Sequence, residues 1–373
     1  MISSRPYPNI KALFFGKNKV FDYSLIKFYS LGREALLSGL TALNIQRGDS
    51  IVVPAYLCNS VIEPLKKYGI NLIFVDVKDD LSLPLSSLKE VVKSRQIKAV
   101  LLVHYFGFTR NIDDLILFCR EQNIAVIEDA SHSLLSQFFG NENKYKGDIE
   151  IFSIRKSLPV IDGGALRVNI DNCKSIEIQR RRCVSIASDA IYIFKRFLEM
   201  IVVTLGVNLY GRFDKFKSKL RDQNSAKYCD INANACQPSW QLSRYLGNKF
   251  YLDRIQSRIT KNFDILNDEL SILGFRSFIG PLRKGLVPQA FPLYDDYGGL
   301  ESYLRTNGIR AWRWPDKEIP LEILKNSDIY KNTIYFNEKL VFLPIHQSIT
   351  IEQCCFMIQV LARWQSKNLK KEG

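Results

Sequence analysis

The chain has 373 residues, 46% of them hydrophobic, which is typical of a soluble protein that buries a large core. Because single cores stop growing near roughly 250–300 residues, we expect two domains. The formal net charge of +14 indicates an anionic partner, for which a small anionic substrate and an anionic membrane surface both stay open. Nucleic acid is disfavoured, since no zinc-finger, ribonucleoprotein or helix-turn-helix pattern accompanies the charge.

The first part of the chain alternates short apolar segments with amphipathic ones. We predict strands at residues 50–54, 71–75, 99–104 and 124–128. Apolar residues three and four positions apart predict helices between them, at residues 61–68, 85–92 and 113–122. Short apolar strands separated by helices specify an α/β fold in which a mostly parallel sheet is sandwiched by helices.

From about residue 242 the pattern changes to a long helical segment, mixed strands and a last amphipathic helix at residues 350–364. We therefore predict a large domain over residues 1–241 and a smaller C-terminal α+β domain over residues 242–373.

The segment 189–210 of the large domain is apolar on nearly all sides. Its charged residues Lys195, Arg196 and Glu199 argue against a membrane-spanning helix. We favour a helix buried against the body of the protein or against a second subunit. The alternative, which is less favoured, is an interfacial helix that lies on a membrane.

The eight cysteines are scattered and form no C-x-x-C pair, although Cys354 and Cys355 are adjacent. This distribution argues against a zinc site and against a disulfide framework, so we predict no metal and a reducing compartment. Residues 1–11 lack the charged start, apolar run and small-residue cleavage site of a signal peptide. We therefore expect a cytoplasmic protein.

Two chemical groups stand at the ends of neighbouring predicted strands. Asp129 ends one buried strand, and Lys156 lies just past the next. Ligands of parallel sheets bind beyond the carboxyl ends of the strands, where both residues fall. A lysine amine forms a Schiff base with an aldehyde, and a carboxylate keeps a pyridine nitrogen protonated. The pair predicts a site for pyridoxal phosphate, against the plainer interpretations of a surface lysine and a helix-capping acid.

Several other segments support this interpretation by their order and spacing. They are Gly32-Arg33-Glu34-Ala35-Leu36, residues 48–56, Phe74-Val75-Asp76, Val103-His104-Tyr105-Phe106-Gly107, residues 127–132, Phe152-Ser153-Ile154-Arg155-Lys156, Asp162-Gly163-Gly164-Ala165, Asn307-Gly308-Ile309 and Leu343-Pro344-Ile345-His346. With them the chain resembles, over nearly its whole length, the DegT/DnrJ/StrS family of sugar aminotransferases. These are pyridoxal phosphate enzymes of fold type I, and the resemblance implies this fold.

The resemblance also implies catalytic roles. Lys156 becomes the Schiff-base lysine and the proton shuttle, which suits a lysine whose pKa is lowered by burial and a neighbouring cation. Asp129 pairs with the pyridinium nitrogen. His132 occupies the place near the 3-hydroxyl of the ring, for which a plain core histidine is the alternative.

For the phosphate, the resemblance implies the helix start at Gly32 and Arg33, whose N–H groups and dipole hold an anion, together with the Ser153 hydroxyl. An ordinary helix start is the alternative for Gly32. Most family members have serine-glycine-threonine where this chain has Leu31-Gly32-Arg33, so a hydroxyl is lost and a guanidinium can substitute.

A second departure concerns the aromatic residue that stacks on the cofactor ring. Counted from Pro54, this chain has Cys58 at that position, so stacking comes from Tyr56 or His104, or is weaker. The family's asparagine-arginine element, which reaches the partner's cofactor, is not evident, and Asn234 or Ser239 stands near its place.

The resemblance implies that the protein is a homodimer with shared active sites. It implies transfer of an amino group, with glutamate as the expected donor, to a nucleotide-linked keto-sugar. Such products enter surface polysaccharide, lipopolysaccharide or antibiotic sugars, and the basic charge suits a diphosphate-bearing substrate. Two rivals stay open. A sugar dehydratase on the same cofactor is disfavoured, because that branch has histidine in place of Lys156. A non-catalytic binding or regulatory protein is favoured only by the departures at Arg33 and Cys58.

Overall fold

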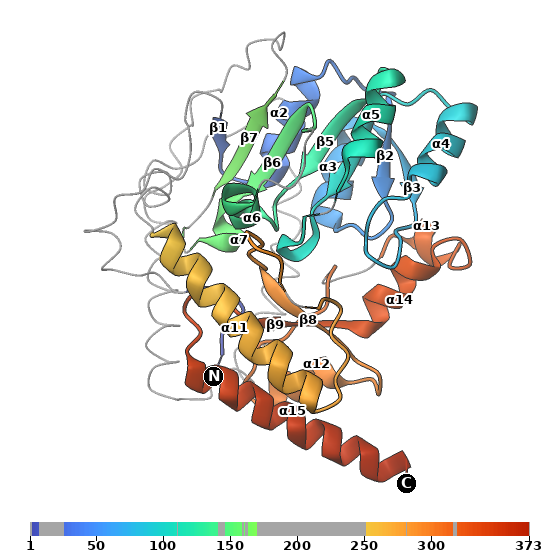
Figure 1. Cartoon of the computed structure of the whole chain (residues 1–373). Coiled ribbons are helices and arrows are strands. Elements are labelled where there is room, and N and C mark those ends of the chain that lie inside the picture. Colours follow the sequence, from blue (N-terminus) through green and yellow to red (C-terminus); the bar gives the residue numbers. More distant parts are fainter. Residues whose placement is uncertain are drawn as a thin grey trace, which may run out of the picture.

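A computed structural model describes residues 2–6, 26–109, 111–140, 146–158, 160, 163–169, 251–280, 282–315 and 319–372 (Figure 1). Several predictions lie outside these ranges and stay predictions, namely those on the segment 189–210, on Asn234 and Ser239 and on the boundary at residue 242. Among the described helices, none combines the length and the hydrophobicity needed to cross a membrane.

A seven-stranded sheet with the order β1-β7-β6-β5-β4-β2-β3 forms the centre of the larger group of elements. Its strands are β1 (Ile26–Tyr29), β2 (Ser50–Pro54), β3 (Asn71–Val75), β4 (Ala99–Val103), β5 (Ala125–Asp129), β6 (Ile149–Ser153) and β7 (Gly164–Val168). Neighbouring strands run parallel except where β7 pairs with β6 and with β1. The central strands are short apolar runs because helices bury both of their faces.

Helices cover the two faces of this sheet (Figure 1). The main ones are α2 (Gly32–Ala42), α3 (Asn59–Tyr68), α4 (Leu85–Ser94) and α5 (Asp113–Glu121). Side chains of α2 and α3 share one core with Leu101 and Ile127, whereas α4 and α5 share another with Val100 and Val126. Both β4 and β5 contribute side chains to the two cores, because successive side chains of a strand point to opposite faces of the sheet.

A smaller group of elements begins after residue 250. In it, β8 (Ala290–Tyr294) and β9 (Leu340–Pro344) pair antiparallel. The helices are α11 (Leu252–Ile272), α12 (Leu300–Thr306), α13 (Leu321–Leu324), α14 (Lys331–Lys339) and α15 (Ile351–Glu372). Figure 1 shows these elements below the large sheet, next to the short helix α7 (Ile154–Ser157) that follows β6.

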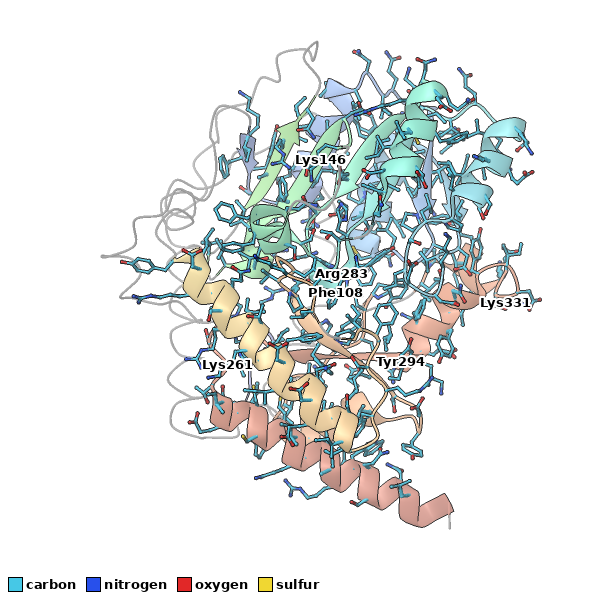
Figure 2. All side chains as sticks on the ribbon, in the orientation of Figure 1. Phe108, Lys146, Lys261, Arg283, Tyr294 and Lys331 are labelled. Atoms are coloured by element: carbon cyan, nitrogen blue, oxygen red, sulfur yellow. The ribbon has the colours of Figure 1, made fainter. Side chains whose placement is uncertain are left out.

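Polar and aromatic contacts join the two groups of elements. Asp76 follows β3 and accepts hydrogen bonds from the N–H groups of Asn332 and Thr333, each 2.9 Å long, at the start of α14. A carboxylate suits this place because a helix leaves its first N–H groups unpaired. Phe108 lies where the groups meet (Figure 2), and its ring centroid is 6.2 Å from that of Phe263 in α11. The carboxyl edge of the large sheet is thus covered by the smaller group.

The predicted fold class is confirmed, since a mostly parallel sheet lies between helices. The strands and helices predicted up to residue 128 agree with the observed bounds to within two residues, and the strands at residues 50–54 and 71–75 match them fully. The prediction for the last helix was wrong at its end, because α15 continues past Trp364 to Glu372. Asn368, one turn further on, is also buried, and its Nδ2 donates to the Trp364 carbonyl at 2.9 Å. The buried stripe therefore extends beyond the last apolar residue that the pattern used.

Candidate active site

Asp129 and Lys156 come from neighbouring strands. β5 ends at Asp129, and β6 ends at Ser153, from which α7 carries Lys156. The strands pair in parallel with Asp129 opposite Ile151, so their carboxyl ends lie at one edge of the sheet. The carboxylate of Asp129 is close enough to raise the pKa of Lys156. The structure therefore brings the predicted pair together.

The Lys156 side chain is half-buried, and burial is the main reason why its pKa lies below the ordinary value of a lysine. The cations of Arg155 and Arg5 lower this pKa further, whereas Cys58 and Asp129 oppose the shift. A lysine with a lowered pKa is more often a neutral amine, which is the form that attacks a carbonyl carbon.

The chain turns sharply after Asp129, whose side chain is 8% exposed. Its Oδ1 accepts a hydrogen bond of 2.9 Å from the N–H of Ser131, and the Ala130 N–H donates to the Ile151 carbonyl at 2.8 Å. An aspartate that binds a backbone N–H two residues on is a common way to fix a turn. The turn holds the carboxylate and the next two side chains in a set arrangement.

His132 follows this turn and is buried. Its Nδ1 accepts a long hydrogen bond, 3.5 Å, from the Phe106 N–H, and the two rings stack with centroids 5.4 Å apart. Burial lowers the pKa of His132 well below its ordinary value, and the nearby Lys156 cation lowers it further. The imidazole is therefore neutral near pH 7, and acceptance at Nδ1 leaves the proton on Nε2, which can act as a donor.

The start of α2 forms the part of the site that suits a phosphate. Gly164 of β7 lets this turn come close, because a Cβ there would lie 2.3 Å from the carbonyl carbon of Leu31 and 2.6 Å from the Gly32 nitrogen. A Cβ on Gly32 would lie 3.6 Å from Ser131 Oγ and 3.9 Å from Ser153 Cβ. A helix N-terminus beside two hydroxyl-bearing side chains fits a phosphate group. Together with Lys156 and Asp129, this helix start fits pyridoxal phosphate.

Cys58 precedes α3, and its Sγ lies 2.9 Å from Ser60 Oγ. Burial raises the pKa of the Cys58 thiol, while the nearby Lys156 cation opposes this shift. A neutral thiol therefore faces the lysine at the position where the resemblance implied an aromatic ring. Among the described residues, no three histidine, cysteine or acidic side chains come together as a metal site.

The structure does not turn the His104 side chain toward Asp129 and Lys156. Its Nε2 lies 2.7 Å from Glu128 Oε2, and both side chains are buried. Since Glu128 precedes Asp129 in β5, the two acids point to opposite faces of the sheet. Burial alone would raise the pKa of Glu128, but the hydrogen bond and charge of His104 and the Gly147 N–H lower it below its ordinary value. The His104 imidazole thus holds the ends of β4 and β5 together.

Tyr56 is fully buried among aromatic side chains. Its hydroxyl donates to the Trp314 carbonyl, and its ring contacts Tyr105 and Trp314 with centroids 5.6 and 4.9 Å away. These contacts link β2 to the smaller group of elements. Tyr56 and His104 thus contact other protein groups, and their stacking on a cofactor ring stays a prediction.

Three residues near the site were not predicted. Arg5 lowers the pKa of Lys156, Ser131 faces the start of α2, and Trp314 packs edge to face on His132 with centroids 5.2 Å apart. Ser131 lies inside a predicted motif, so its position in the sequence carried a signal. Arg5 and Trp314 are far from the motifs along the chain, and only the fold brings them near.

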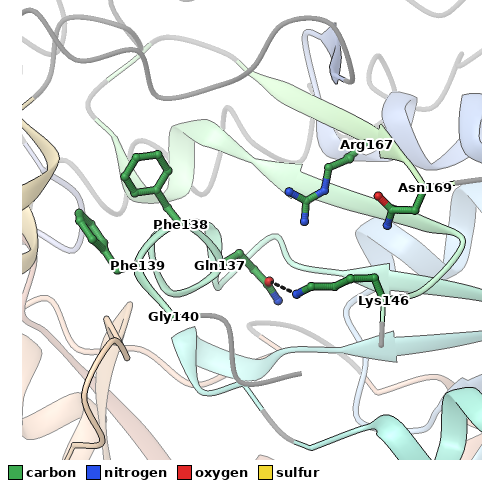
Figure 3. A pocket seen from close by; sticks show the side chains of 7 residues that line it. All are labelled: Gln137, Phe138, Phe139, Gly140, Lys146, Arg167 and Asn169. Atoms are coloured by element: carbon green, nitrogen blue, oxygen red, sulfur yellow. Dashed lines mark hydrogen bonds between the residues drawn. The ribbon is translucent and has the colours of Figure 1, made fainter. Parts of the chain in front are cut away.

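A separate pocket of about 340 Å³ lies at the other end of β6 (Figure 3). It is lined by Gln137, Phe138, Phe139, Gly140, Lys146, Arg167 and Asn169. Arg167 stands opposite Glu150, near the amino end of β6, whereas Ser153 ends that strand at the candidate site. Inside the pocket, Lys146 Nζ donates to Gln137 Oε1 at 3.0 Å. The pocket is therefore distinct from the site around Lys156.

The sheet order, the helix start at Gly32 and the pair of Asp129 and Lys156 define a pyridoxal phosphate-dependent enzyme of fold type I. Residues 29–196 match the sequence model of the DegT/DnrJ/EryC1/StrS aminotransferase family. The predicted resemblance, the predicted cofactor and the predicted class of enzyme, an aminotransferase, are confirmed.

Comparison with individual proteins extends the likeness. GDP-perosamine synthase of Escherichia coli O157:H7 is 22% identical over 271 residues, which are 68% of this chain and 72% of the synthase. A solved structure from Streptococcus pneumoniae, a protein named as a sugar aminotransferase and in its PMP form, has a TM-score of 0.71 at 16% identity and covers 100% and 99% of the two chains. GDP-4-keto-6-deoxymannose-3-dehydratase has a TM-score of 0.64 at 17% identity, over 97% and 100%. At these identities the two structures show the shared fold alone.

Proposed function

We propose that the protein transfers an amino group to a keto-sugar carried on a nucleotide, with glutamate as the donor. The observation that carries the proposal is Lys156, whose pKa is raised by the Asp129 carboxylate and which follows Ser153, a residue close to the helix start at Gly32. The relative that makes GDP-perosamine by name supports a nucleotide-linked sugar as the substrate. The net charge of +14 favours a substrate with a diphosphate.

In this proposal each residue has one chemical task. Pyridoxal phosphate, when bound, supplies the carbonyl that takes up the amino group and a ring that accepts electrons. Lys156 holds the cofactor covalently and moves the substrate proton on its Nζ. The Asp129 carboxylate keeps a proton on the ring nitrogen, and His132 donates from Nε2 toward the ring hydroxyl. Gly32 and Ser153 bind the phosphate.

Spectroscopy of the purified protein tests the proposal. The bound cofactor is expected to give a visible absorption band, and glutamate alone should bleach it because the amino group stays on the cofactor. A nucleotide keto-sugar should then restore the band and yield an amino-sugar by mass spectrometry. A protein with no cofactor band would contradict the proposal in favour of a binding or regulatory role.

A sugar dehydratase is the second candidate, because a dehydratase of nucleotide sugars shares this fold. Lys156 argues against this candidate, since the dehydratases related to this family typically have histidine at that position. The same assay separates the two, because a dehydratase would release a sugar that has lost a hydroxyl and gained no nitrogen.

We further propose a cytoplasmic homodimer whose subunits share each active site, with the segment 189–210 buried at a contact. The support is the apolar run of this segment, because large apolar patches normally mark an interface. We expect a dimer by mass in detergent-free solution and no flotation with anionic liposomes. A monomer with salt-sensitive flotation would instead favour docking of this segment on a membrane.

A further inference from the structure

We propose that the Ser131 hydroxyl binds the phosphate of the cofactor together with the start of α2. This inference rests on the proposed function and concerns a residue to which the sequence motifs gave no role. It gives the phosphate a hydrogen-bond donor from the turn after β5, in addition to the donors from α2 and from the end of β6.

The position of the Ser131 hydroxyl carries the inference. Ser131 Oγ lies 3.6 Å from the place where a Cβ on Gly32 would stand, so it faces the first turn of α2. The side chain is 8% exposed, and its hydroxyl makes no hydrogen bond within the described part of the chain. A hydroxyl of a largely buried residue that has no protein partner gains from a ligand that accepts its proton.

The chemistry of the helix start identifies this ligand as an anion. The Gly32 N–H likewise has no hydrogen-bond partner among the residues the structure describes. The first N–H groups of a helix point outward, and its dipole attracts negative charge. A phosphate has enough oxygens to accept from the Gly32 N–H and from the hydroxyls of Ser131 and Ser153 together.

The neighbouring sequence leaves a place for a hydroxyl from Ser131. Residue 33, the second of α2, is arginine, so this helix start brings no hydroxyl of its own within its first two residues. Ser131 supplies a hydroxyl from the turn after β5. Its backbone N–H, not its side chain, binds Asp129 Oδ1, so the hydroxyl is left for a ligand while the turn stays fixed.

The same bond makes Ser131→Ala a clean test, because the variant keeps the backbone contact with Asp129. The apo-protein is titrated with pyridoxal phosphate and with pyridoxal, which has the same aldehyde and ring but no phosphate. Ser131→Ala should weaken binding of pyridoxal phosphate by about 10- to 100-fold, the range for a hydrogen bond to a charged group. Its affinity for pyridoxal should not change.

Ser133→Ala is the matched control, since Ser133 is a buried serine two residues further on and its hydroxyl also lacks a partner among the described residues. It should bind both compounds as the unmodified protein does. Equal affinity of Ser131→Ala for pyridoxal phosphate would overturn the inference, as would an equal loss for both compounds, which would mean that Ser131 supports the fold and not the phosphate. If the unmodified protein binds neither compound, the proposed function itself fails.

Discussion

Replacing Lys156 by alanine is expected to abolish amino-group transfer and covalent capture of the cofactor together. The lysine supplies the amine that binds the aldehyde and the base that moves the substrate proton, and both tasks need its position beyond β6. Its lowered pKa provides the neutral amine at lower pH than an ordinary lysine would. The expected loss in kcat is at least about 10⁴-fold.

Reduction with borohydride, followed by peptide mapping, measures the covalent link. In the unmodified protein the label should sit on the peptide that contains Ser153 and Lys156, and Lys156→Ala should carry none. Lys146→Ala is the matched control, because Lys146 is also half-buried but binds Gln137 at the other end of β6. Its label should equal that of the unmodified protein. A label on any other lysine would refute the assignment of Lys156.

The large sheet could be predicted from the sequence because its strands carry a strong local signal. Residues 50–54 and 99–103 are buried on both faces, so they are continuous apolar runs, and the helices between them show one apolar stripe each. The end of α15 was missed because a buried asparagine, Asn368, continues its stripe. Such a residue is polar in the sequence but satisfied inside its own helix, and apolar periodicity does not detect it.

The pair of Asp129 and Lys156 could be predicted because each of the two residues lies at or just past the end of a strand. Asp129 and Lys156 end or follow neighbouring parallel strands, and the geometry of such sheets brings them to one edge. Arg5 and Trp314 reach the site only through tertiary packing, for which the sequence carries no local pattern.

His104 shows a different limit of sequence reasoning. Its place next to a motif made it a candidate for ring stacking, but the face of the sheet decides its partner. In the paired strands Leu102 lies opposite Glu128, and His104 follows two residues later on the same face. The imidazole therefore meets Glu128, while Asp129 points to the other side. Strand pairing had to be known before this alternation could be used.

Replacing Asp129 by asparagine is expected to lower kcat by about 100-fold or more while the fold stays intact. The amide oxygen of asparagine can still accept the Ser131 N–H bond that the carboxylate accepts now at 2.9 Å, so the turn is kept. What is lost is the negative charge that holds a proton on the ring nitrogen, and without it the ring accepts electrons less readily.

The same substitution has a second, independent readout in the apo-protein. The Asp129 charge raises the pKa of Lys156, so its removal should lower this pKa below the already depressed value. Capture of an aldehyde needs the neutral amine, and the pH at which capture is half-maximal should therefore move downward. Asp114→Asn, at an exposed position in the first turn of α5, is the control and should leave both the rate and this pH unchanged. Near-normal turnover of Asp129→Asn, with an unshifted pH for capture, would mean that another residue faces the ring nitrogen and that Asp129 serves the turn alone.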